Sequence, residues 1–389
     1  MRNSITLTIL FALVALCATD SIAQRRNQYG YKRSTSKKYS KYKGGKVGYS
    51  GVGNPKYYTI GASINMNNYF GDISKSSSKL SSNYKFIPDG FGITASKVLY
   101  PGIYARAGFN YGNIKASDYS TGNSNPGNSD EERSDYGRWQ RNYHFKNTIT
   151  ELSAGFEVDL IPSNGGARNR FPINPYLFVG AAVFHHAPKA KAPGATYDSD
   201  GDGVADAAVD QAGNVLDVKP GEWIDLQKLG TEGQYSDSLD LKPYSKFQFA
   251  IPLGLGVKVK LARSWDLQFE VGFRYLFTDY LDDIGGDYAD LDDFGDDYLA
   301  RAMSERGAET KAMMEGKDRN ISGITGQQNV QLNTADLSGW TGGNSYTHGY
   351  NYVAGQDRAS SKYKDFLVTT QIRLVYILDK KGASRGKFR

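Results

Sequence analysis

The chain has 389 residues, a formal net charge of +6 and a mean hydropathy of −0.53. After the N-terminus no apolar run approaches the roughly 18 residues that a membrane-spanning helix needs, which excludes a helical membrane protein. The composition includes 28 Tyr, 18 Phe and 44 Gly against one Cys and five Met, a usage typical of many strands with aromatic girdles and tight turns.

Residues 1–23 have the features of a secretory signal peptide. Arg2 gives the positive start, Ile5–Ala18 the apolar region, and Ser21–Ala23 a small-x-small cleavage site before Gln24. A membrane-anchoring helix is the alternative, but the apolar run is short and a cleavage site follows it. Cys17 leaves with this segment, so we expect neither disulfides nor cysteine-ligated metal in the mature chain.

Residues 24–56 form a basic, low-complexity segment that lacks the aliphatic residues needed to offset the entropy of ordering. We expect a disordered periplasmic tail that docks on an acidic partner or an anionic surface, and the alternative is a solvated linker. Nucleic acid is excluded as a partner, because the signal peptide directs the chain away from it. The candidate partner-binding residues are Arg25, Arg26, Lys32, Arg33, Lys37 and Lys38.

Beyond the tail, apolar and polar residues alternate, which predicts β-strands because successive side chains of a strand point to opposite faces. The pattern is clearest in the two strands that flank the turn Ala262–Trp265. One face of each strand carries aromatic and aliphatic residues, and the opposite face carries charged residues and glycine. In chain order the predicted strands are 57–70, 90–99, 103–114, 144–160, 175–185, 247–261, 267–277 and 363–378.

Eight strands are an even number, as a closed antiparallel barrel with adjacent termini requires. Connections after the odd-numbered strands are long, including loops at 115–143, 187–245 and 280–362, and the others are shorter. Outer-membrane barrels have short periplasmic turns and long extracellular loops. The sequence therefore predicts an all-β, eight-stranded transmembrane barrel over 57–378 in the outer membrane, surrounded by its lipid, with a basic C-terminal tail at 379–389 and both termini in the periplasm. A soluble, lipocalin-like barrel with its apolar face inside is the alternative.

Charged residues fall on the face predicted to point into the barrel. An eight-stranded barrel is just wide enough for side chains to fill it. Buried charges are tolerable when they are paired and hydrogen-bonded, so we expect ion pairs that form a structural core rather than a channel. The interior charges are Arg106, Glu151, Glu157, Glu270, Arg274 and Arg373.

One segment in the loop 187–245 has the spacing of a calcium loop. It begins D-x-D-x-D-G, with glycine at the sharp turn, but Val209 stands where a bidentate Glu belongs. Calcium with a structural role is one interpretation, and an acidic turn is the other. The candidate ligands are Asp198, Asp200, Asp202, Val204 and Asp206.

The segment Asp279–Asp297 contains nine Asp, which indicates either a site for divalent cations or a basic partner, or a solvated loop. Helical propensity follows over Leu299–Lys317. The adjacent His185 and His186 lie at the end of a predicted strand, so their rings point to opposite faces and do not share a metal easily. No Ser/His/Asp arrangement, P-loop or dinucleotide fingerprint occurs, and we expect no enzymatic activity.

Two segments resemble a known family. Tyr57–Gly61 leading to Asn68–Asp72, and Phe269–Tyr275 running into Phe277–Asp283 with the sequence Thr-Asp-Tyr-Leu-Asp-Asp, resemble the PorG-type outer-membrane barrels of the Bacteroidetes type IX secretion system. The loops at 187–245 and 280–362 are longer than a minimal barrel needs, and the basic tail has no matching motif.

The resemblance implies a non-enzymatic component that anchors or scaffolds a periplasmic ring, built from a lipoprotein and a soluble subunit, at the outer membrane. That machine exports proteins with C-terminal sorting domains and, in gliding species, supports motility. The rival interpretations are a surface barrel that acts as an adhesin or ligand-binding protein through its long loops, and a barrel enzyme with a catalytic set at its mouth.

Overall fold

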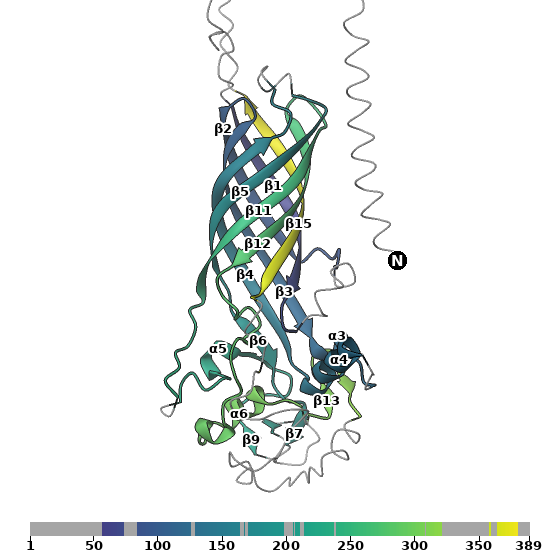
Figure 1. The fold of residues 1–389 in the computed structure, drawn as a ribbon, viewed down its shortest axis with the longest axis vertical. Coiled ribbons are helices and arrows are strands. Elements are labelled where there is room, and N and C mark those ends of the chain that lie inside the picture. The colour runs from purple at the N-terminus through teal and green to yellow at the C-terminus, as the bar shows by residue number, and fades with distance from the viewer. Residues whose placement is uncertain are drawn as a thin grey trace, which may run out of the picture.

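The computed structural model describes residues 57–73, 84–125, 129–163, 167, 170–197, 205, 207–210, 214–236, 239–307, 309–320, 358 and 364–379. Eight long strands form a closed antiparallel barrel (Figure 1). They are β1 (Tyr57–Phe70), β2 (Gly90–Tyr100), β3 (Ile103–Ser117), β4 (His144–Asp159), β5 (Ile173–His185), β11 (Phe247–Lys260), β12 (Trp265–Leu276) and β15 (Phe366–Asp379).

Each strand pairs with its neighbours in chain order, and the first and last strands close the barrel. β1 pairs with β15 from Tyr57 opposite Asp379 to Phe70 opposite Phe366. β4 pairs with β5, which leaves no open edge among these eight strands. The fold class predicted from the alternation is confirmed.

Apolar side chains cover the outside of the barrel and polar ones fill its inside. Leu152 is 64 % exposed and Phe249 66 %, whereas Arg373 is 1 % exposed. A soluble barrel would reverse this arrangement, because water would face the outer surface. The lipocalin-like alternative is therefore wrong, and the wall is built to face lipid. No helix of the described residues is long and apolar enough to cross a membrane.

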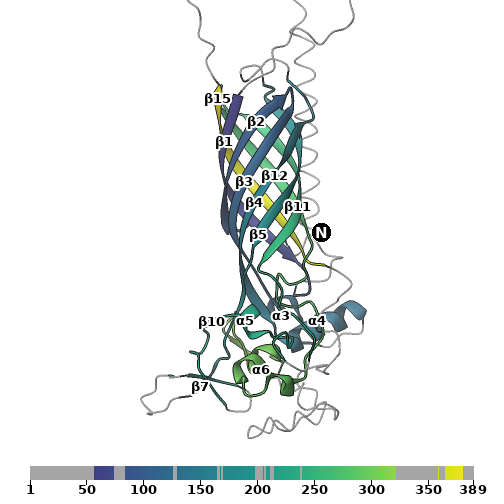
Figure 2. The same cartoon turned by 90° about the vertical axis from the view of Figure 1, so that its left-hand side faces the viewer.

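The two ends of the barrel differ. One end carries the short connections around Gly102 and Ala262 together with the first residue of β1 and the last residue of β15. The other end carries a folded cap (Figures 1 and 2). The cap elements are α3 (Asp118–Thr121), α4 (Asp130–Arg141), β6 (Pro188–Lys191), β7 (Ala195–Tyr197), β8 (Ala207–Val209), β9 (Val215–Leu216), β10 (Trp223–Asp225), α5 (Leu226–Leu229), η3 (Leu291–Phe294), α6 (Tyr298–Ser304), β13 (Lys311–Ala312) and β14 (Lys317–Asp318).

The long connections thus contain ordered elements that the strand pattern did not predict. The helix expected over Leu299–Lys317 is shorter, since α6 ends at Ser304. Beyond it the chain turns into the two-stranded pairing of β13 with β14, which a helix of the expected length would prevent.

A hydrophobic core joins the cap to the mouth of the barrel. Phe145 and Leu281 are completely buried in it, and Ile284 and Leu291 come from the same connection as Leu281. Leu276 at the end of β12 and Leu367 at the start of β15 belong to the same cluster. Because this core uses residues from both the wall and the connections, the cap and the barrel mouth pack as one unit.

Candidate functional site

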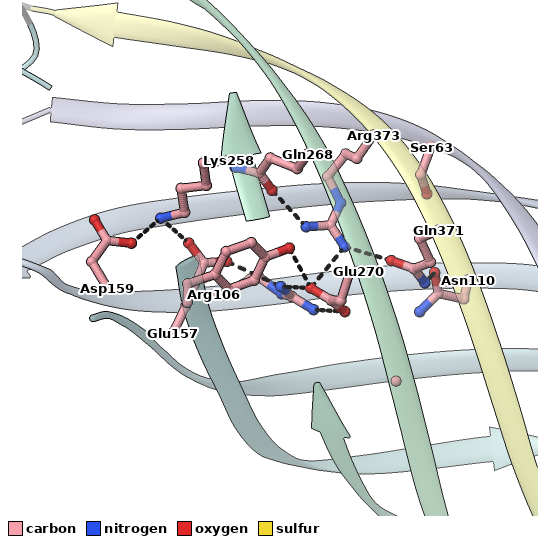
Figure 3. Close-up of polar contacts among 12 residues, drawn as sticks. Ser63, Arg106, Asn110, Glu157, Asp159, Lys258, Gln268, Glu270, Gln371 and Arg373 are labelled. Atoms are coloured by element: carbon pink, nitrogen blue, oxygen red, sulfur yellow. Dashed lines mark hydrogen bonds and ion pairs between the residues drawn. The ribbon is translucent and has the colours of Figure 1, made fainter. Parts of the chain in front are cut away.

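Ion pairs occupy the inside of the barrel. The guanidinium of Arg106 contacts both carboxylate oxygens of Glu270, with Nη1–Oε2 2.5 Å and Nη2–Oε1 2.8 Å. It also donates to Glu157 at 3.0 Å (Figure 3). The Nη2 of Arg373 lies 3.5 Å from Glu270 on the other side. Arg274 and Glu151 form a separate pair at 3.0 Å. The structure therefore places all six predicted interior charges inside the barrel and pairs them with one another.

Two further charges extend this network. Lys258 donates to Glu157 at 2.6 Å and to Asp159 at 2.5 Å. Period-two counting along β11 and β4 puts both side chains on the inward face, so the signal for them was present in the sequence. The linked network of Arg106, Arg373, Lys258, Glu157, Asp159 and Glu270 contains three cations and three carboxylates, so its charges balance.

Neutral side chains complete the packing inside the barrel. The Tyr176 hydroxyl donates to Glu270 at 2.8 Å. The guanidinium of Arg106 lies over the ring of Phe178, with the Arg106 Cζ 3.7 Å from the centre of that ring. A cavity of about 20 Å³ remains next to Lys258 and Tyr57, which is room for about one water molecule. This interior is a packed core and offers no continuous passage along the described residues.

Acidic side chains converge at the mouth, beneath the cap. Asp72, Asp279 and Asp365 each place one oxygen within 4.8 Å of the others. The Tyr69 hydroxyl lies 2.5 Å from Asp282 and 3.0 Å from Asp365, and it donates its single hydrogen to one of them. Burial raises the pKa of the Asp282 and Asp365 carboxyls well above the usual range, and neighbouring carboxylates raise it further.

The spacing and oxygen ligands of this cluster are of the kind that hold a divalent cation. Sequence analysis did not single out Asp72 or Asp365 as ligands, although the closure of a barrel brings the first strand next to the last. Phe70 lies opposite Phe366 in the register, so the residues that follow β1 and precede β15 must meet.

The segment Thr278–Asp283, which carries the family resemblance, lies over the mouth. Leu281 is completely buried, and Asp282 and Asp283 are each 1 % exposed. Asp283 accepts hydrogen bonds from Thr231 at 2.5 Å and from Tyr244 at 2.6 Å. Burial raises the pKa of the Asp283 carboxyl to about 7. This part of the Asp-rich run is therefore buried and hydrogen-bonded within the cap and is not a solvated loop. Asp292 and Asp296, farther along the run, are exposed.

Buried arginines tie the cap elements together. Arg358 donates to Tyr143 at 3.2 Å and to Thr231 at 2.8 Å. Arg319 donates to the carbonyl oxygens of Trp139 and Gln140 at 2.8 and 3.0 Å. Arg319 thus joins α4 to a connection that lies far away in the sequence, and Arg358 joins Tyr143 to Thr231. No periodic pattern predicts these contacts.

The adjacent histidines point to opposite faces, as expected for a strand. His186 is fully buried, and its Nε2 lies 3.3 Å from the carbonyl oxygen of Ser245. Burial lowers the pKa of His186 to about 4. His185 instead packs edge-on against Phe247 on the outside.

The predicted signal peptide at 1–23 and residues 380–389 of the predicted C-terminal tail lie outside the described residues, and so do two sets of predicted site residues. The two sets are the basic tail (Arg25, Arg26, Lys32, Arg33, Lys37 and Lys38) and the candidate calcium ligands (Asp198, Asp200, Asp202, Val204 and Asp206). The strands β7 and β8, which flank the second set in the sequence, pair antiparallel, with Tyr197 opposite Ala207.

Together, the lipid-facing wall, the filled interior and the folded cap define the class: an eight-stranded β-barrel of the outer-membrane type. Within that class, the chain belongs to the family described as "Domain of unknown function (DUF6089)", whose model matches residues 53–206 and 230–296 and thus more than half of the chain.

Solved structures of outer-membrane proteins are similar to this chain at low sequence identity. OprG from Pseudomonas aeruginosa is 6 % identical, with 84 % of this chain and 98 % of that chain covered and a TM-score of 0.30. A major outer-membrane protein of Thermus thermophilus is 10 % identical, with coverage of 83 % and 99 % and a TM-score of 0.30. Ail, the attachment invasion locus protein of Yersinia pestis, is 7 % identical, with coverage of 83 % and 99 % and a TM-score of 0.28. No curated protein matches the chain.

Proposed function

We propose that this protein is a non-enzymatic outer-membrane component of a type IX secretion system, where it anchors the periplasmic ring of a lipoprotein and a soluble subunit. The observation that carries the proposal is the filled interior. A barrel whose core is occupied by Arg106, Glu270 and their partners has no solute path, so its work is done by its ends and its outer surface.

The resemblance to PorG-type barrels supports this assignment. The Thr278–Asp283 segment that carries it closes the mouth of the barrel, with Leu281 and Asp283 buried. A segment in that position fixes the shape of the cap, a structural role that suits a scaffold.

The layout of the chain supports an orientation in which the cap is extracellular and both termini are periplasmic. Outer-membrane barrels place long connections outside and short turns in the periplasm. The basic tail at 24–56 then enters the same compartment as the ring. A cationic segment suits an acidic surface, because charge attraction needs no fixed geometry.

Mild-detergent co-purification of an epitope-tagged chain, followed by mass spectrometry, tests the proposal. We expect the ring lipoprotein and its soluble partner to be recovered. A variant with the six tail cations Arg25, Arg26, Lys32, Arg33, Lys37 and Lys38 changed to Gln should recover less of both. A tail with the same composition in scrambled order is the matched control, and it should retain binding if charge is what the ring recognises. Recovery of the barrel alone, even after cross-linking, contradicts the scaffold role.

The size of the cap favours a second candidate, a surface protein that binds a ligand or an adhesion partner through its long connections. The cap has its own buried clusters, including Ala208, Leu216 and Ala302, and a simple closure of the barrel does not need them. Asp292 and Asp296 are exposed on this cap. Substitution of both by Asn should leave secretion intact under the scaffold proposal, and loss of surface binding with normal secretion would favour the second candidate.

A further inference from the structure

Three lysines form a continuous row on the outer face of the sheet where it extends beyond the barrel wall. Lys115 on β3 lies directly opposite Lys146 on β4, and Lys146 lies directly opposite Lys189 on β6. All three side chains are exposed. Neighbouring strands are about 4.8 Å apart, so the row presents three ammonium groups over about 10 Å.

Stability of the sheet gives no reason for this row. Like charges that are directly opposite in neighbouring strands destabilise a sheet. None of the three lysines forms an ion pair with a residue that the structure describes. Asp89 is electrostatically coupled to Lys115, but its carboxylate accepts a 2.8 Å hydrogen bond from Asn67.

The acidic residue that lies opposite the last lysine of the row already has another cation as its partner. Asp225 on β10 lies opposite Lys189, yet its carboxylate is bonded to Lys246 at 2.6 Å. An aromatic ring stands beside the row instead, since the ammonium of Lys146 lies 5.7 Å from the centre of the Trp223 ring. Tryptophan is enriched at membrane interfaces, where its ring lies at headgroup level.

The height of the row matches that of lipid headgroups. On β3 the exposed aromatic face ends at Tyr111, which lies next to Phe91 of β2, and Lys115 follows four positions later. Four residues span about 13 Å along a strand, or about 10 Å along the axis of a barrel whose strands tilt by about 40°. Headgroups extend about 5–8 Å beyond the hydrocarbon on each side, and a lysine stem reaches back toward them.

We propose that Lys115, Lys146 and Lys189 bind the phosphate groups of a lipid in the leaflet next to the cap. The lysines supply three strong hydrogen-bond donors for phosphate oxygens, and a phosphorylated lipid supplies the ion-pair partner that none of the described residues gives them. The inference depends on the lipid-facing wall and not on the proposed secretion role. The bound lipid would fix the rotation and depth of the barrel in the membrane on the side where β6 lies at the end of β4 (Figure 1).

Native mass spectrometry of the full mature chain tests this proposal, with bis-phosphorylated lipid A and its dephosphorylated form as probes. We expect the wild type to retain the phosphorylated lipid, and the variant with Lys115, Lys146 and Lys189 changed to Gln to bind it on the order of 100-fold more weakly, at about fivefold per lysine. Because these side chains are exposed, the variant should keep the heat-modifiable mobility of a folded barrel.

The matched control removes the same charge from three other exposed cap lysines, Lys219, Lys242 and Lys317. Its affinity for phosphorylated lipid should stay within about twofold of wild type. Equal loss in the control and the row variant, or equal retention of both lipid forms by the wild type, would overturn the proposal. Displacement of the lipid by millimolar inorganic phosphate would also overturn it, since the row would then be a site for soluble anions.

Discussion

Removal of Glu270 should leave two buried arginines without their shared counter-charge. Glu270 accepts two hydrogen bonds from Arg106 at 2.5 and 2.8 Å, lies 3.5 Å from Arg373, and accepts from Tyr176 at 2.8 Å. In the Glu270→Ala variant, Arg106 keeps Glu157, but that carboxylate already neutralises Lys258. The linked network then changes from three cations and three carboxylates to a net positive charge.

Breaking a buried ion pair by removing one partner costs about 3–5 kcal/mol, because the remaining charge is left uncompensated. Glu157 reduces that cost, so we expect a loss of about 3 kcal/mol in the free energy of unfolding. The measurement is urea unfolding of the protein refolded in lipid vesicles, with the slope of the denaturant dependence checked for a two-state transition.

A double-mutant cycle separates the pair from the packing. The double variant Arg106→Met with Glu270→Met should be more stable than the sum of the two single variants Arg106→Met and Glu270→Met predicts, since replacing both charges of a buried pair is often neutral. Asp296→Ala, at an exposed acid of the cap, is the control and should change stability by less than about 0.5 kcal/mol. A loss below about 1 kcal/mol in Glu270→Ala, or additive losses in the cycle, would refute the account of the interior as a charge-balanced core.

Three further predictions concern the cap and the wall. Burial raises the pKa of Glu305 to about 8 from an unfolded value near 4.5, so this group's stabilisation is complete below pH 4.5 and is lost as the pH rises through 8. The protection factors of the α6 amides, which are corrected for the intrinsic rise of exchange with pH, should fall over that window, and Glu305→Gln should abolish the fall. Phe247 and Phe249 are 67 % and 66 % exposed, and changing both to Ser should reduce the fraction of protein that inserts into vesicles, whereas unchanged insertion would mean that they do not face lipid. A Cβ at Gly155 would lie 2.2 Å from the carbonyl oxygen of Val179, so Gly155→Ala should separate β4 from β5 and lower the urea midpoint by the equivalent of about 1–3 kcal/mol, while an unchanged midpoint would contradict this close approach of the two strands.

The barrel was predictable because one repeated signal specifies it. In β11 every second residue from Phe247 faces lipid and the residues between them face the interior, so the period alone assigns each side chain to a side. The first predicted strand and β1 have the same bounds, Tyr57 to Phe70. Strand ends were less exact where the chain continues as strand into the cap. β3 extends to Ser117, because its last residues pair with β4 beyond the wall.

The cap was not predictable in the same way, because its contacts join residues that no period relates. Arg358 reaches Tyr143 and Thr231 across more than a hundred positions, and Asp283 is buried by partners from another connection. The interior charges were partly predictable, less than the strands of the wall and more than the contacts of the cap. Their side followed from the period, but the choice of Glu270 rather than Glu151 as the partner of Arg106 depends on how the strands stagger around the barrel.

The filled interior also restricts how the protein can be made. The cap segments lie at the opposite end from the first residue of β1 and the last residue of β15, and ion pairs block the route between the two ends. A chain that enters from the side of its termini must therefore carry every cap segment across the membrane while the wall is still open. Closure requires β1 to meet β15, which comes last in the chain among the eight wall strands, so translocation of the cap has to precede this pairing. Once β1 and β15 have paired, a cap segment that was left on the wrong side of the membrane can no longer cross through the filled barrel. The order of these two steps is therefore fixed.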